Sequence, residues 1–510
     1  MAISEVIVER LPLVLSTSVV FLAVYLFKIF LTPDPLANLP IIGEDLGGDE
    51  KRRQQFRLNA KATYNEGYKK FRDGLFRIIT TRNSQVVVVS PDFLDELKRL
   101  PDDMLSFSAA AMEGMHSKYT QLRDEPLLPH TIKTSLTPGL VRLNPTVADE
   151  VQDAIRLEMP PCDDWTPVRI NQKLLRVVAM ASGRILVGPE LCRSEEYLES
   201  AIKYTIELME ARSAVDAIPP WIRPFKASRL PQVKQLDQRI KKATAFMQPI
   251  VEARLALNRA DVKPDDMLQW MIDDQMKEQH GKLDIERQAR LQLSVSFVSI
   301  HTTTLTATNV FYNLAAFPEH NEELRQEIRT VLAEHGGVFS STALQAMKKV
   351  DSFLKESMRF HTPGVSSFQR KVLKPFTLSN GQHIPAGIII EVPAQAIAMD
   401  PEMFEEPDKF DGLRFYKMRE KAREAGEFDV AGQGQFVSVS KGSLSFGYGR
   451  HACPGRFFAG NEIKMIVANY LLNYDIKLAD GYTERYPNIE MGGTSVPDPT
   501  KELLFKRIST

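Results

Sequence analysis

Cysteine is scarce in this chain, which has only Cys162, Cys192 and Cys453 among its 510 residues. An odd, widely spaced set of three is no disulfide framework, and it contains no pair at the spacing of zinc ligands. An excess of one charge is missing too, because 64 Lys and Arg residues face 65 Asp and Glu residues, for a net charge of −1. We therefore expect a reducing environment around the body of the protein and no binding to nucleic acid.

Glycine and proline, at 27 and 31 residues, are too few for a collagen-like or low-complexity chain. Hydrophobic residues make up 43% and charged residues 25%, which are ordinary values for a globular protein and exclude intrinsic disorder. No internal repeat, second linker or long block of like charge interrupts the chain after residue 50. These absences predict one folded domain over residues 51–510.

The longest uncharged, mostly apolar run near the N-terminus covers the 17 residues 11–27 and resumes after Lys28. A membrane-spanning helix needs roughly 20 such residues. A cleaved signal peptide fits less well, because Glu5 and Glu9 precede the run and no A-x-A-like site follows it. We expect an uncleaved single-pass anchor over residues 1–32 in the endoplasmic reticulum membrane. Basic residues at 28 and 51–53 place the body in the cytosol, after a Pro-rich hinge over residues 33–50.

The body alternates charged and apolar residues at helical spacing up to about Phe360, for example over residues 196–212 and 237–259. Strand-like runs are few and short, and they cover residues 86–89, 374–378, 387–392 and 503–505. The pattern predicts a mainly α protein with a minor β-sheet.

Residues 291–317 contain no Asp, Glu, Lys, Arg, Gly or Pro. A second membrane span is conceivable, but the serines, threonines, His301 and Asn309 in this run make it too polar for lipid. We expect a long central helix inside the protein. Its buried hydroxyl groups and histidine need partners, and a bound cofactor or ligand would supply them.

The segment from Phe446 to Gly455 holds three glycines and one proline around Cys453, which is typical of a tight irregular loop, and a helix is expected over residues 456–472. A sulfur held there meets unpaired backbone N–H groups and the positive end of the helix dipole. Both favour a thiolate, the form of cysteine that binds metals. The alternative for a lone cysteine is an inert buried residue.

The pattern Phe446-x-x-Gly449-x-x-x-Cys453-x-Gly455 resembles the haem-binding loop of cytochromes P450. Two more motifs occur in the order of that family: Glu356-x-x-Arg359 on a predicted helix, and residues 407–415 with Arg414. Alone, the first is no more than a surface ion pair. Together they imply a cytochrome P450 fold preceded by one N-terminal transmembrane helix. The cofactor would be haem b with Cys453 as axial thiolate ligand of the iron, and Glu356, Arg359 and Arg414 would form a structural triad beneath it.

The family's pattern on its distal helix, small-Gly-x-acid-Thr-Thr, is similar to residues 298–303 of this chain. The resemblance implies that Thr302 is the oxygen-activating alcohol, although its hydroxyl could merely bond to a carbonyl one turn earlier. His301 replaces the usual acid and Ser299 the usual glycine, so His301, Thr302 and Thr303 are all candidates for proton delivery. This variant resembles ascomycete secondary-metabolism members such as ent-kaurene-oxidase-like enzymes.

The same resemblance suggests further contacts. Haem-binding candidates besides Cys453 are Phe446, Gly447, Arg370, His451, His130 and Lys133. Arg370 and His451 would serve the anionic propionates, whereas His130 and Lys133 replace a Trp-x-x-x-Arg pair and could equally be surface residues. Candidate substrate contacts are Phe107, Met112, Val298, Val365, Phe368 and Thr494.

The resemblance implies a monooxygenase that uses O2 and electrons from NADPH-cytochrome P450 reductase, with cytochrome b5 as an optional second donor. The anchor and an apolar pocket would suit a small lipophilic substrate, such as a fungal terpenoid, polyketide or alkaloid. Two alternatives stay open. The same fold could couple phenolic or indolic substrates without oxygen insertion, or the protein could be a haem-binding sensor without turnover.

Overall fold

The computed structural model describes residues 16–17, 19–21, 23, 34–257 and 263–508. The expected anchor at 1–32 falls almost wholly outside these residues. Within the described part of the chain, no helix combines the length and the apolar character that crossing a bilayer requires. The described part of the expected hinge is packed against the body, because Leu36, Leu39 and Ile42 are buried and Ile41 forms a bridge to Arg77.

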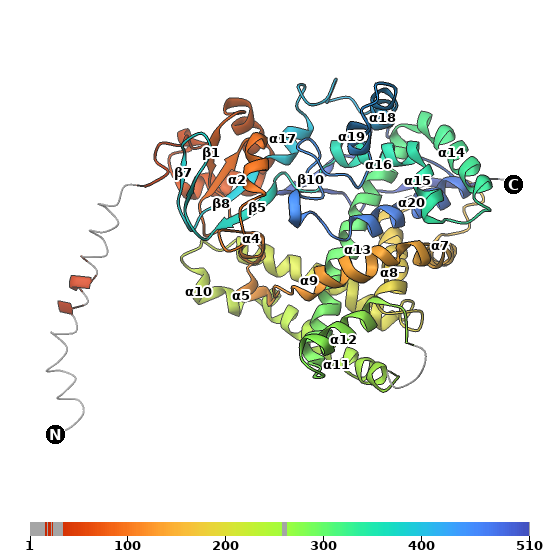
Figure 1. Ribbon diagram of the computed structural model, residues 1–510, viewed down its shortest axis with the longest axis horizontal. Helices are drawn as coiled ribbons and strands as arrows, with labels where there is room; N and C mark the ends of the chain where they lie inside the picture. The colour runs from red at the N-terminus through yellow and green to blue at the C-terminus, as the bar shows by residue number, and fades with distance from the viewer. Residues whose placement is uncertain (1–15, 18, 22, 24–33, 258–262, 509–510) are drawn as a thin grey trace.

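The larger β-sheet lies at one end of the molecule (Figure 1). Its strands follow the order β1 (Leu75–Ile78), β2 (Val86–Val89), β8 (Ile389–Val392), β5 (Ser367–Val372) and β3 (Leu105–Ser106). Only the β2–β8 pair is parallel. Helices α2 (Asp49–Lys70), α4 (Phe107–Gly114) and α17 (Ala394–Ala398) lie beside it. The four valines of β2 are all buried, which explains why this strand was evident from the sequence.

Helices make up most of the remaining described chain. The longest are α7 (Thr137–Glu158), α8 (Ile170–Leu186), α9 (Glu195–Asp216), α11 (Pro231–Leu257), α13 (Ile285–Ala316), α14 (Asn321–Glu334), α16 (Lys348–Phe360) and α20 (Arg456–Asn473). Shorter ones are α3 (Leu94–Leu97), α5 (Ser117–Thr120), α6 (Leu127–Thr131), α10 (Arg223–Lys226), α12 (Met267–Glu278), α15 (Ser341–Ala346), α18 (Arg414–Glu424) and α19 (Phe428–Gln433). The prediction of a mainly helical protein with a minor sheet is confirmed.

Helix α13 crosses the middle of the molecule and contacts α8, α9, α11, α16 and α20 (Figure 1). Most of its side chains from Leu291 to Ala315 are buried. This confirms the expected central helix, which begins six residues before the uncharged run because Asp284 caps it by accepting a hydrogen bond from the Arg287 N–H at 3.0 Å. Most of its polar residues after Thr302 are therefore held in the interior.

The other strands form three small sheets. One has the order β4 (Thr166–Val168), β12 (Leu503–Arg507), β9 (Tyr474–Leu478), and the others pair β6 (Phe376–Thr377) with β7 (His383–Ile384) and β10 (Asn488–Met491) with β11 (Thr494–Pro497). The sequence did not indicate β5, because its buried positions alternate as expected for a strand but one of them holds Arg370. That charged residue belongs to the candidate site.

Candidate active site

The loop before α20 holds Cys453 by backbone geometry. The N–H of Cys453 donates to the carbonyl of Phe446 at 2.7 Å, which closes the loop. Gly447 and Gly449 adopt φ values of 77° and 70°, in the left-handed region that favours glycine. A Cβ on Gly449 would also come within 3.1 Å of the Lys98 side chain. The glycines of the motif are therefore needed for the turn that presents the sulfur.

The Cys453 side chain is accessible, although protein atoms surround it closely enough that burial raises the pKa of its thiol. The N–H groups of Gly455 and Arg456, and the charge of Arg456, act in the opposite direction and lower that pKa. The expected N–H groups at the start of α20 are thus in place, but burial outweighs them in the chain alone. Cys162 and Cys192 are buried, and burial raises their pKa values as well.

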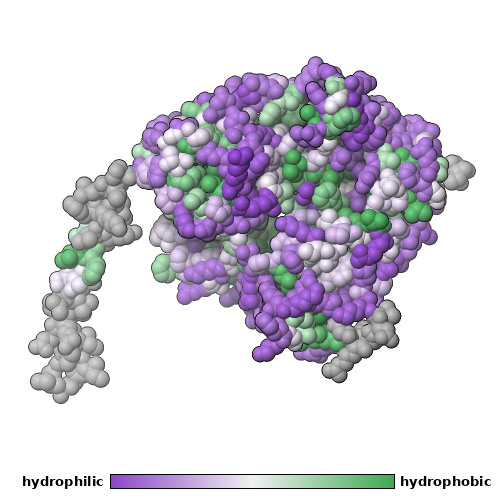
Figure 2. All heavy atoms as spheres, in the orientation of Figure 1, coloured by the Kyte–Doolittle hydropathy of each residue, from purple (hydrophilic) through white to green (hydrophobic). Residues whose placement is uncertain are grey.

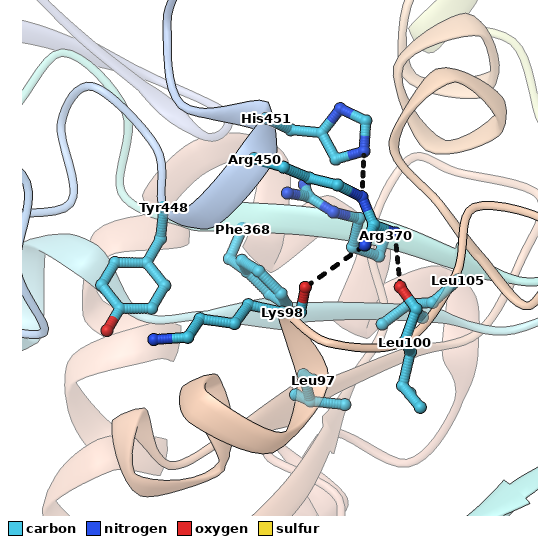
Figure 3. Close-up of a pocket in the computed structure, with 9 residues that line it drawn as sticks. All are labelled: Leu97, Lys98, Leu100, Leu105, Phe368, Arg370, Tyr448, Arg450 and His451. Atoms are coloured by element: carbon cyan, nitrogen blue, oxygen red, sulfur yellow. Dashed lines mark hydrogen bonds between the residues drawn. The ribbon is translucent and has the colours of Figure 1, made fainter.

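A group of cationic side chains lies beside this loop (Figure 3). Arg370 of β5 lines a small cavity with Lys98, Tyr448, Arg450 and His451. Its guanidinium lies 4.3 Å from the ring centroid of Phe368 and 5.2 Å from that of Phe107. Burial lowers the pKa of Arg370 to about 10, and its one described hydrogen bond goes to the Gln369 carbonyl at 2.9 Å. Most of its N–H groups are therefore available to an anion.

Asp102 joins the cationic group from a distant part of the sequence. Its carboxylate lies 2.7 Å from Nε2 of His451 and 2.8 Å from Nη2 of Arg450. Arg450 also donates to the carbonyls of Lys98 and Leu100 (Figure 3). The His451 ring stacks on Phe107 with 5.5 Å between centroids. No sequence signal pointed to Asp102, because it lies 349 residues from His451 and belongs to no motif.

His130 ends one turn of α6, and Lys133 lies in the following π-helical turn, Ile132–Leu136. Both side chains are exposed, and neither forms a hydrogen bond among the residues that the structure describes. Their predicted contact with haem propionates stays a prediction.

The Glu356 triad is assembled as the resemblance implied. Arg359 donates to both Glu356 oxygens at 2.8 Å, and Arg414 donates to Oε1 at 3.1 Å. Glu356 is fully buried. Arg359 also bonds to the carbonyls of Ala398 and Pro407, so the triad ties α16 to the segment before α18. It is not a surface ion pair.

Two neighbours on α16 extend this network and were missed by sequence reasoning. Lys355 donates to the carbonyls of Gln433 and Gln435 at 2.8 and 2.7 Å. Asp351 accepts from Lys464 of α20 at 2.5 Å and from the Phe436 N–H at 2.8 Å. The segment that leads to the cysteine loop is thereby fixed on both sides.

Thr302 lies on α13, the helix that carries the pattern expected for the distal side of the site. Its side chain is exposed, whereas Thr303, Thr304 and Thr306, which follow it on the same helix, are buried. Its hydroxyl donates to the carbonyl of Val298 at 2.7 Å, which is the one-turn bond that the sequence left open. The hydroxyl oxygen keeps acceptor capacity toward the accessible space.

His301 connects two helices rather than facing only the site. Its Nε2 lies 3.1 Å from the Ile202 carbonyl of α9, so we assign the ring proton to Nε2 and leave Nδ1 as an acceptor. Burial lowers the pKa of His301. The imidazole is therefore held neutral, and its proton is bound to α9.

The candidate substrate contacts fall into two groups. Val298 is 45% exposed on α13 and Met112 is partly exposed on α4, whereas Val365 is buried and Thr494 donates to the Met491 carbonyl. Phe107 and Phe368 instead flank Arg370, and Phe368 adopts a left-handed φ of 52°. Phe446 packs edge-on against Phe436 at 5.4 Å.

These observations fit a haem. A cysteine is accessible deep in the protein, Thr302 and Val298 are accessible on a helix that is otherwise largely buried, and Arg370 has donor groups without acceptors. A flat cofactor between the loop and α13 would contact all of them. Cys453 would bind its iron, while Arg370 and His451 would hold its propionates.

Comparison with known proteins gives a consistent result. The family model "Cytochrome P450" matches residues 127–505. The chain is 41% identical to cytochrome P450 monooxygenase ATR3 of Stachybotrys chlorohalonatus over 83% of the chain and 89% of that protein. It is 36% identical to cytochrome P450 monooxygenase braC of Annulohypoxylon truncatum over 97% of each. It is also 34% identical to cytochrome P450 monooxygenase olcJ of Penicillium canescens, over 98% and 94%.

Proposed function

The chain belongs to the cytochrome P450 family and is a monooxygenase, and we propose that it oxidises a lipophilic secondary metabolite of a fungus at the membrane of the endoplasmic reticulum. The observation that carries the proposal is that the loop before α20 holds Cys453 with an accessible side chain, while Thr302 is accessible on the otherwise largely buried α13. Haem bound through that sulfur supplies the activation of dioxygen and the insertion of one oxygen atom into a C–H bond.

The residues of this chain contribute position and proton control. The Glu356 triad and Lys355 hold the segment that precedes the loop, so the sulfur is presented without reorganisation. Arg370, with free N–H groups, and His451 orient the cofactor through its carboxylates. These side chains would hold the carboxylates of the cofactor beside the loop.

On the distal side, Thr302 is the residue that transfers protons toward dioxygen. Its hydroxyl donates to the Val298 carbonyl in this structure. Rotation of the hydroxyl away from Val298 would let it donate its proton into the site while its oxygen takes a replacement proton from water. His301 acts differently from the acid it replaces, because its Nε2 proton is bound to Ile202 and its pKa is lowered by burial. We therefore assign proton delivery to Thr302 and water. The role that we assign to His301 is to link α13 to α9.

Members of this family use O2 and a redox partner. We assign the latter role to NADPH-cytochrome P450 reductase, with cytochrome b5 as an optional second donor. Membrane association is supported by two large exposed side chains in the connection between α9 and α11, Trp221 at 77% and Phe225 at 72%. Exposed Lys226 and Arg229 flank them and suit anionic headgroups. The predicted anchor over residues 1–32 and a cytosolic catalytic domain complete the proposal.

The experiment that tests the site is the difference spectrum of the reduced, CO-bound protein, recorded for the wild type and Cys453→Ala. We expect the red-shifted Soret band of a thiolate ligand in the wild type and its loss in the variant. Cys192→Ala, which removes a buried cysteine elsewhere, is the matched control and should keep the band. A band that survives in Cys453→Ala would refute the assignment of the ligand.

Product mass then separates the reactions that this fold can perform. With reductase and NADPH, hydroxylation adds one oxygen atom to the substrate, whereas oxidative coupling gives a dimer less two hydrogens. A haem sensor would consume NADPH no faster with substrate than without it.

A further inference from the structure

One stripe of α9 faces toward α13. Ile202 lies on it, because its carbonyl contacts His301 of α13. Thr205, Met209, Arg212 and Asp216 follow at spacings of three and four residues and so share this face of the helix. Polar residues at Thr205 and Arg212 are therefore directed to the same side of α9 as the contact with the site helix.

Arg212 has donor groups without acceptors. Among the residues that the structure describes it forms no hydrogen bond, and its Nε is buried without a partner. Its one ion pair, to Asp216, spans 3.7 Å between Nε and Oδ2, which is too long for a hydrogen bond. Thr205 on the same stripe is 3% exposed, and its hydroxyl also lacks a described partner. A buried polar group without a hydrogen-bond partner lowers the folding stability by about 1 to 3 kcal/mol unless a ligand supplies that partner.

Among the described residues, the carboxylate that acts on Arg212 is that of Asp216, and it has other partners. Asp216 accepts or shares a proton with Nε2 of His116 at 2.8 Å, and Thr81 hydrogen-bonds to the same carboxylate. Arg82 adds a second positive charge close enough to disfavour the charged form of Arg212. The charges that act on Arg212 are thus one carboxylate and one other guanidinium, and His116 is bonded to the carboxylate. The local balance favours one more anion.

The side chain of Arg212 is placed to reach a ligand. Burial lowers its pKa, so protein surrounds it closely, yet 27% of its side-chain surface is accessible. Cys453 shows the same combination of close surroundings and an accessible side chain. Figure 2 shows the molecule hollowed near the middle of its face, between the sheet end and the helices below it. A guanidinium that protein surrounds closely and that is still partly accessible can be reached by a small ligand.

Other arginines of this chain show how many acceptors a buried guanidinium usually has. Arg359 and Arg325 are buried and each donates to several carbonyl or carboxylate oxygens. Arg370 has a single described bond, and the haem propionates account for its other donors. Arg212 has no described hydrogen bond, and it does not line the cavity beside the cysteine loop to which Arg370 and His451 belong.

We propose that Arg212, assisted by Thr205, binds a carboxylate of the substrate, so that this monooxygenase acts on lipophilic carboxylic acids. The inference rests on the proposed function and adds the class of its substrate. A guanidinium suits a carboxylate because its planar donors match the two oxygens. Ten residues of helix separate Ile202 from Arg212, about 15 Å along the axis at 1.5 Å per residue. A carboxylate bound at Arg212 would therefore lie farther along α9 than the contact of Ile202 with His301.

The experiment measures binding to the haem-loaded enzyme by isothermal titration calorimetry. The probes are the saturated acids from decanoate to eicosanoate and their methyl esters, which have the same chains without the charge. We expect the best acid to bind the wild type at least tenfold more tightly than its ester. Arg212→Gln should abolish that preference without weakening ester binding, and Arg212→Lys should keep part of it.

Lys203→Gln is the matched control, because it removes one positive charge from the half-exposed outer side of the same helix. It should keep the preference for the acid. Acids that bind the wild type no better than their esters, or an equal loss of preference in Lys203→Gln, would overturn the proposal. The CO-bound spectrum of each protein reports haem ligation separately, so a normal thiolate band without acid preference rejects the substrate class and leaves the function standing. Should Arg212→Gln fail to fold, the proposal is tested by the ratio of acid to ester affinity in the wild type and by the change of that ratio in Arg212→Lys.

Discussion

The two sides of the site are built on opposite principles. On the proximal side, Glu356 accepts from Arg359, Arg414 and a backbone N–H, and Lys355 and Asp351 are bonded to several partners. On the distal side, the hydroxyl of Ser299, the hydroxyl of Thr205 and Nε of Arg212 lack described partners. A saturated network fixes one geometry, whereas unpartnered groups are available to a ligand. The described polar groups are therefore largely paired around the proposed iron ligand, and several lack partners where we propose that substrate and oxygen bind.

We expect the largest effect on the proximal side from Glu356→Ala. It leaves two buried guanidiniums without their carboxylate, a change that costs about 3 to 5 kcal/mol. We expect loss of stable haem incorporation and a much lower thermal midpoint, measured by the CO-bound spectrum and by calorimetry. Glu322→Ala removes the exposed partner of Arg325 and should change stability by about 0.5 kcal/mol at most. Similar effects of both variants would mean that the triad does not brace the loop.

We expect substitutions on the distal side to change the reaction and to leave the folding stability almost unchanged. Thr302→Ala removes the accessible hydroxyl, so protons reach dioxygen less efficiently and more of it is released as peroxide. We expect the ratio of peroxide to product to rise severalfold while the thermal midpoint barely changes. Thr306→Ala is the control, because it removes a buried hydroxyl that bonds to the Thr302 carbonyl. Unchanged coupling in Thr302→Ala would assign proton delivery to His301, Thr303 or water.

One buried carboxyl group on the proximal side has few hydrogen-bond partners, and we expect its replacement to have a smaller effect on stability. Glu462 of α20 is completely buried with Ser182 as its one described partner, and burial raises its pKa from 4.5 to about 8. Because the folded state holds this proton more tightly than the unfolded chain, its contribution is complete below pH 4.5 and is lost as the pH rises through about 8.

Replacement by glutamine mimics the protonated form. We expect Glu462→Gln to raise the thermal midpoint by a few degrees relative to the wild type at about pH 8 and by less at about pH 5. Glu484→Gln, at an exposed position, should show no such difference between the two pH values. An advantage of Glu462→Gln that is equal at both pH values would show that the carboxyl is not protonated in the folded protein.

Local signals account for what could be predicted. Buried valines marked β2, the uncharged run marked α13, and the glycines around Cys453 marked the loop, because each property depends on residues close in sequence. Strand β5 was missed since a buried Arg370 interrupts the apolar alternation by which strands are recognised. Asp102, Lys355 and Arg212 carry no motif, and their surroundings come from distant segments.

The sequence by itself was enough to identify the family, the triad and the cysteine that we propose as the iron ligand, because short motifs encode turns and helical spacings directly. Only the tertiary structure decided that the His301 proton is bound to α9, that Asp102 joins the cationic group, and that Arg212 lacks an acceptor. The reason is physical: the state of a polar group depends on its desolvation and its partners, and these come from the packing of elements far apart in the chain.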